Sequence, residues 1–153
     1  MRQKKVEEAS AQFRRATELK PELPEPHYYL GMIALEAAKE KEAVAHFREA
    51  ARRQPNWRDP ANNLAWILAT SSNDEIRNGI ESLQVARRVV ENNRDAASLD
   101  TLAAALAESK DFPAAIETAE QALKLAQEPG NEPLKKQIAD HLKFYRVGKP
   151  FRE

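Results

Sequence analysis

Histidine and carboxylate side chains are the residues of this 153-residue sequence that could carry acid–base chemistry or bind a metal ion. The three histidines, His27, His46 and His141, fall on three different predicted helices. They form no H-E-x-x-H motif and no pair four residues apart, the spacing that places two imidazoles on one helix face. The acidic residues fall where solvated helix faces would carry them, whereas acid–base catalysis needs a concave apolar site. We therefore expect structural or solvated histidines, no metal and no enzymatic activity.

Motifs for nucleotide binding and for nucleophilic catalysis are also missing. The sequence contains no G-x-S-x-G, no P-loop and no G-x-G-x-x-G, and its four glycines are dispersed. Scattered glycines cannot build a loop that cradles a phosphate group. We expect no cofactor.

A basic cluster next to a tryptophan could indicate nucleic-acid binding by charge and stacking. Arg52, Arg53 and Arg58 flank Pro55 and Trp57. The alternative is that arginines near a helix C-terminus meet the helix dipole and that the tryptophan packs between successive helical hairpins. Lys+Arg and Asp+Glu both number 24, so the chain has no excess positive charge for a polyanion. We expect no nucleic-acid partner.

The composition indicates a chain with a core and a heavily charged surface. Hydrophobic residues make up 42% of the sequence and the mean hydropathy is -0.70. No apolar stretch approaches the length of a membrane-spanning helix, so we expect no membrane insertion by this segment. The absence of cysteine fits a reducing compartment, and we expect a cytoplasmic location. An extracytoplasmic location stays open if the parent protein is membrane-anchored.

These side chains must be positioned by helices, because apolar residues recur three and four positions apart between proline-containing breaks. A pattern of small, aromatic and small residues followed by proline occurs twice, at a spacing of 34 residues: Ala9, Phe13, Ala16 and Pro21 recur as Ala43, Phe47, Ala50 and Pro55. The small residues let two helices approach closely, the phenylalanine fills the space beside them, and the proline ends the helix. The predicted class is all-α.

This 34-residue pattern resembles the second helix of the tetratricopeptide repeat (TPR), whose pattern is W-x2-L-G-x2-Y, then A-x3-F-x2-A and P. Leu30 and Gly31 match the first helix, while His27 replaces the tryptophan and Ala34 the tyrosine. The resemblance implies a right-handed α-α superhelix, or TPR solenoid, of about three and a half helical hairpins plus a C-terminal capping helix. It implies one domain, 1–153, that divides into a half repeat (1–21), a repeat (24–57), a repeat with an insertion (58–94), a repeat (96–129) and the capping helix (131–146).

Two of these units have features of their own. In the third unit, 70–79 contains extra residues, and we predict that Ser72 and Glu75 form a capping box before a helix at 80–92. That helix places Ser82, Ala86 and Val89 at the small, aromatic and small positions, and the next unit has Ala115, Ala119 and Ala122 there. After a break at 127–131, the capping helix carries an apolar stripe of Leu134, Ile138, Leu142 and Tyr145, and Gly148 with Pro150 ends it.

In this family the first helices line a concave groove, and the resemblance implies a partner-binding set of Tyr28, Met32, Leu35, Asn62, Asn63, Trp66, Thr70, Asp100, Thr101 and Ala104. Aromatic, methionine and asparagine side chains suit the capture of a peptide. The alternative is that Tyr28, Met32 and Trp66 pack within the hairpins. Only Asn63 matches the carboxylate clamp of co-chaperone members, so capture of an acidic chaperone tail is disfavoured.

The C-terminal half also resembles the terminal repeats of large bacterial TPR proteins, through the runs at 62–70, 78–79, 99–105 and 145–151. Several such proteins carry a membrane-embedded glycosyltransferase-like region, which implies that this chain is a C-terminal fragment. Two functions follow as expectations. The chain is a non-catalytic module that binds a protein or peptide partner in its groove, or it is the structural end of a longer TPR protein. In the second case it contacts its own upstream repeats or forms a homo-oligomer through its truncated N-terminal helix.

Overall fold

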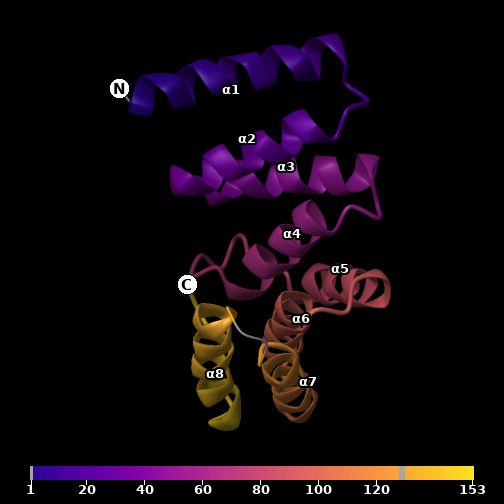
Figure 1. Cartoon of the computed structure of the whole chain (residues 1–153), viewed down its shortest axis with the longest axis vertical. Helices are drawn as coiled ribbons and strands as arrows, with labels where there is room; N and C mark the ends of the chain where they lie inside the picture. Colours follow the sequence, from indigo (N-terminus) through magenta and orange to yellow (C-terminus); the bar gives the residue numbers. More distant parts are fainter. Residues whose placement is uncertain (1, 128–129) are drawn as a thin grey trace. The chain divides into compact units, whose positions relative to one another are not determined.

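The computed structural model describes residues 2–127 and 130–153, and these residues form eight α-helices and no β-strand (Figure 1). The helices are α1 (Arg2–Leu19), α2 (Glu25–Glu36), α3 (Glu40–Arg53), α4 (Arg58–Thr70), α5 (Gly79–Asn92), α6 (Ala96–Glu108), α7 (Phe112–Leu125) and α8 (Glu132–Arg146). The predicted all-α class is confirmed. Part of the predicted break at 127–131, residues 128 and 129, lies outside the described residues.

The helices form two compact units, Met1–Leu64 and Ala65–Glu153, with the boundary inside α4. We describe each unit by itself, and the superhelix stays a prediction. Among the helices of the described residues, none combines the length and the apolar character needed to cross a membrane.

In the first unit, α2 and α3 form a tightly packed hairpin around the small and aromatic positions of the repeat pattern. Ala43, Phe47 and Ala50 of α3 are completely buried. A Cβ atom at Gly31 of α2 would lie only 2.7 Å from the Phe47 ring, so the ring occupies the space that the glycine leaves free. Phe13 of α1 does not take part in this contact and stacks instead on the Tyr29 ring of α2. The close approach inferred from the pattern is therefore present.

The second unit is held together by small residues where its helices cross. Ala65 and Ala69 of α4 cluster with alanines of α5 and α6, and Ser82 of α5 donates a hydrogen bond of 2.7 Å to the Ala65 carbonyl. The three alanines predicted in α7 are buried against the stripe of α8, which contributes Leu134, Ile138, Leu142 and Tyr145. The capping helix predicted from this stripe is confirmed as a helix that packs on α7.

The capping box predicted at Ser72 and Glu75 is wrong. No helix begins there, and α5 begins after Asn78, whose side-chain oxygen accepts a hydrogen bond of 3.1 Å from the Glu81 amide. The Asn78 side-chain amide in turn donates a hydrogen bond of 3.3 Å to the Glu81 carboxylate, so the helix cap lies six residues later than predicted and its second bond joins two side chains. The reason is tertiary, because the backbone of Asn78 is fixed by a hydrogen bond of 2.9 Å to the Leu68 carbonyl.

Gly148 reverses the chain direction after α8. It has a φ of +67°, a left-handed conformation that glycine adopts at little cost. The Lys149 amide donates to the Phe144 carbonyl and the Gly148 amide to the Tyr145 carbonyl, both at 3.0 Å, which is the pair of bonds of a Schellman motif. The predicted stop is confirmed, and after it Phe151 packs back against His141 and Phe144 of α8.

We predict that Gly31→Ala destabilises the chain by roughly 1–2 kcal/mol. Overpacking against Phe47 costs about 1–3 kcal/mol, and the better helix propensity of alanine returns up to about 1 kcal/mol. Urea unfolding followed by far-UV circular dichroism measures this. Phe47→Leu provides the control, since it should cost less in the Gly31→Ala background than in the wild type. A Gly31→Ala variant as stable as the wild type would contradict the close contact.

Candidate functional site

The C-terminal end of α4 is the point at which distant parts of the second unit meet. The last carbonyl groups of a helix have no partner within the helix and must be satisfied from outside. The Leu68 carbonyl accepts from the Asn78 amide at 2.9 Å, and the Ala69 carbonyl accepts from the Arg152 guanidinium at 3.1 Å. The Thr70 carbonyl accepts from the Glu153 amide at 3.0 Å. The partners of this helix end therefore come from up to 83 residues away.

The insertion between α4 and α5 places a second arginine beside the same helix end. Arg77 donates a hydrogen bond of 2.7 Å to the Ser71 carbonyl, and its guanidinium also pairs with Asp74. Its Nε lies 3.5 Å from the Glu108 carboxylate at the end of α6. The negative end of a helix dipole favours cations, so two arginines near α4's end are electrostatically reasonable.

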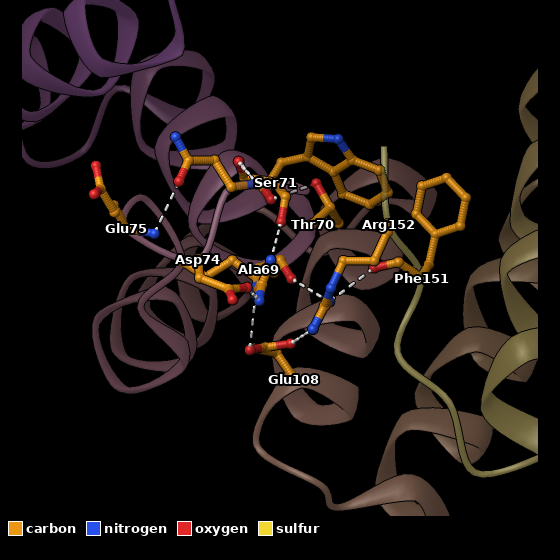
Figure 2. A network of polar contacts seen from close by, with 11 residues as sticks. Ala69, Thr70, Ser71, Asp74, Glu75, Glu108, Phe151 and Arg152 are labelled. Carbon is orange, nitrogen blue, oxygen red and sulfur yellow. Dashed lines mark hydrogen bonds and ion pairs between the residues drawn. The ribbon is translucent and has the colours of Figure 1, made fainter.

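Residues 147–153, which follow α8, return to α4 and α6; we call them the post-α8 segment. Figure 2 shows the Arg152 side chain reaching the Ala69 carbonyl and the Glu108 carboxylate. Glu108 is thus shared by Arg77 and Arg152. The Trp66 indole nitrogen donates a hydrogen bond of 3.0 Å to the Glu153 carboxylate. We call the surface formed by Trp66, Ala69, Thr70, Glu108 and His141 the α4/α6 site.

Three aromatic rings pack together at one side of this site. Phe151 lies 4.3 Å from the His141 ring and 6.0 Å from the Trp66 ring, and Trp66 lies 5.1 Å from His141 between centroids. His141 Nδ1 lies 3.0 Å from both carboxylate oxygens of Asp100. His141 and Asp100 are only 2% and 4% exposed, so this pair is a buried tie between α8 and α6. We expected His141 to be either structural or solvated, and its burial makes it structural.

The predicted partner-binding residues of the second unit lie in two environments. Trp66 is half-buried and faces the post-α8 segment. Thr70, Thr101 and Ala104 are buried: the two hydroxyl groups donate to carbonyls of their own helices, and Ala104 belongs to the alanine cluster. Asp100 is buried with His141. That these residues contact a partner stays a prediction. Trp66 is the best placed of them for such a contact, because it is only half-buried.

The predicted residues of the first unit are half-buried, namely Tyr28, Met32, Leu35, Asn62 and Asn63. The Asn63 amide lies 3.5 Å from the Met32 sulfur, so two of them meet. The Tyr28 ring lies 4.8 Å from the Trp57 ring and 6.1 Å from Phe47. Tyr28 therefore makes the hairpin contacts of the alternative interpretation, and its contact with a partner stays a prediction.

The basic cluster around Trp57 is paired with carboxylates. Arg52 and Arg53 both pair with Glu49, and Arg58 pairs with Asp59. Arg53 also donates to the Pro21 carbonyl. Helix-end arginines with these partners agree with the structural explanation of the cluster.

Sequence reasoning missed a histidine pair in the first unit. His27 Nδ1 of α2 and His46 Nδ1 of α3 lie 3.1 Å apart, so one ring must donate to the other. Burial lowers the pKa of both imidazoles, and the nearby Arg53 charge lowers the pKa of His27 further. The residues are 19 positions apart, and no local spacing rule connects them.

Chemically, the α4/α6 site offers an indole donor, backbone carbonyl acceptors, one carboxylate and an aromatic wall. These groups suit recognition of a peptide.

Within residues 2–127 and 130–153, no group of three or more histidine, cysteine, aspartate or glutamate side chains could hold a metal ion. Comparison with known proteins finds no family model and no curated protein that matches the chain.

We predict that the histidine pair makes stability depend on pH near neutrality. Because each pKa lies below 6.5 in the folded state, the unfolded state binds protons first as the pH falls. The contribution is fully present above about pH 6.5 and is lost as the pH falls from there toward the folded-state pKa. Urea unfolding of the wild type should show lower stability at pH 5.5 than at pH 7.5, and His27→Gln/His46→Gln should reduce that difference. An equal pH dependence of the two proteins would contradict the assignment.

Proposed function

We propose that the chain is a non-catalytic protein-interaction module of the tetratricopeptide type. It binds an extended peptide segment of a partner on the first helix of its hairpins. The observation that carries the proposal is that the post-α8 segment packs on the α4/α6 site. There a stretch of irregular chain lies against α4 and bonds to its Thr70 carbonyl through the Glu153 backbone amide. Any peptide of suitable shape can form a backbone hydrogen bond of this kind, and contacts to its side chains add specificity.

The helix arrangement supports the same proposal. α2 with α3 and α6 with α7 pack as adjacent pairs of 12 to 14 residues per helix. Repeat architectures of this type rely on stacked hairpins for stability, and their helix faces supply extended binding surfaces. Gly31 and the buried alanines occupy the positions that the tetratricopeptide pattern reserves for close packing.

A catalytic role is less well supported by the groups present. His141 and Asp100 have the composition of an acid–base pair, but both side chains are nearly inaccessible. General acid–base catalysis requires a group within hydrogen-bond reach of a bound substrate. The pair is better explained as a tie between α6 and α8.

The proposal is tested by selecting peptides from a random display library on the immobilised chain. We expect enriched peptides whose affinity falls about thirtyfold with Trp66→Ala, since a buried tryptophan at an interface is commonly a hot spot of about 2 kcal/mol. Affinities are measured by fluorescence anisotropy with purified variants.

Gln84→Ala provides the matched control, because Gln84 is an exposed residue of α5 that takes no part in the α4/α6 site. It should leave peptide affinity unchanged. Failure to enrich any peptide, or equal effects of Trp66→Ala and Gln84→Ala, would overturn the proposal.

A further inference from the structure

The contacts of the post-α8 segment define which peptide the α4/α6 site accepts. We infer that the site recognises an extended peptide in which an aromatic residue is followed directly by arginine and then by an acidic residue. Residues 151–153 occupy the site when no such peptide is bound. The inference rests on the proposed function and adds the chemical class of the partner segment.

The arginine position has the most specific contacts. The Arg152 guanidinium donates to the Ala69 carbonyl at 3.1 Å and pairs with Glu108, whose side chain is only 16% exposed. A planar guanidinium can serve a carbonyl and a carboxylate at once through its fixed fork of donors, whereas a lysine ammonium is a point charge. Arg77 holds the same carboxylate from the other side, which keeps Glu108 in place for the incoming arginine.

The acidic position is selected by an indole. The Trp66 Nε1–H group can only donate a hydrogen bond, so it needs an acceptor side chain opposite it. The Glu153 carboxylate supplies that acceptor at 3.0 Å while the Glu153 backbone amide bonds to Thr70. Together these contacts fix the backbone direction of the bound segment relative to α4.

The aromatic position is enclosed on one side by rings. Phe151 packs against His141, Trp66 and Phe144, the last in an edge-on arrangement at 5.6 Å. His141 cannot swing away readily because Asp100 fixes its ring. A flat apolar side chain fits this wall better than a branched one, since stacked and edge-on ring pairs add to simple burial.

The post-α8 segment is suited to exchange because α8 has its own buried anchors in the core. Ile138, Leu142 and Tyr145 anchor α8 in the core, whereas Phe151 and Arg152 are half-buried and Glu153 is exposed. Segments with few buried contacts open locally at low cost. A tethered segment competes as if it were present at roughly millimolar concentration, so it weakens the apparent affinity of an external peptide.

The test uses a fluorescein-labelled heptapeptide with the sequence of residues 147–153, titrated with the full chain and followed by anisotropy. In the variant Phe151→Ala/Arg152→Ala the resident segment is weakened, and we expect saturable binding at least about tenfold tighter than to the wild type. Glu108→Gln added to that variant should weaken binding by about tenfold or more, and so should replacing the peptide's arginine with glutamine. Gln84→Ala in the same background should change nothing.

Far-UV circular dichroism verifies that each variant keeps its helices, and Arg152→Gln alone replaces the double variant if the latter loses helicity. No saturable binding to the variant with the weakened segment, or binding that ignores Glu108→Gln, would overturn the inference. If peptides from the display library still bind through Trp66 in that case, only the assigned peptide chemistry fails. If neither kind of peptide binds, the proposed function fails as well.

Discussion

The carbonyl groups at the end of α4 set the arrangement of the candidate site in the second unit. A helix end that lacks a local cap leaves acceptors to be satisfied. Here the insertion contributes the Asn78 amide, and the post-α8 segment contributes Arg152 and the Glu153 amide. Glu108 is drawn in because the two arginines gathered at this negative helix end need a counter-charge. One unsatisfied row of acceptors therefore brings together three segments that are distant in the sequence.

Small residues at the helix crossings decide where the large side chains of the candidate site can lie. Alanines and Ser82 let α4, α5 and α6 approach closely, so the crossing itself has no room for large groups. Trp66 is consequently displaced to the border of the alanine cluster, where one part of it packs and the rest meets Phe151 and Glu153. Tight packing of small residues and an aromatic cluster at the border are thus two outcomes of the same sequence pattern.

Local features of the sequence predicted the helices well, but not the pairs that form between them. The predicted helix at 80–92 and the capping helix at 131–146 agree with α5 and α8 because glycine, proline and asparagine mark their ends. Periodicity also identified the buried faces of α3, α7 and α8. The contacts between His27 and His46, and between Asp100 and His141, depend on how two helices are rotated about their axes. Spacing along one helix contains no information about that rotation, so these pairs and the seat of residues 151–153 could not be predicted.

The candidate site lies where the second unit departs from the regular repeat. The turns after α2 and α6 end their helices with Ala38 and Lys110 in the left-handed conformation, at φ of +55° and +67°, and their carbonyls are satisfied within the turn. The α4 to α5 connection has eight residues and no positive φ among them, so its helix end stays open to other partners. A regular hairpin turn at this point would consume the acceptors that now bind Arg152 and Glu153. The insertion therefore leaves this helix end open to Arg152 and Glu153, and the candidate site lies where the chain departs from the local rules of a helical hairpin.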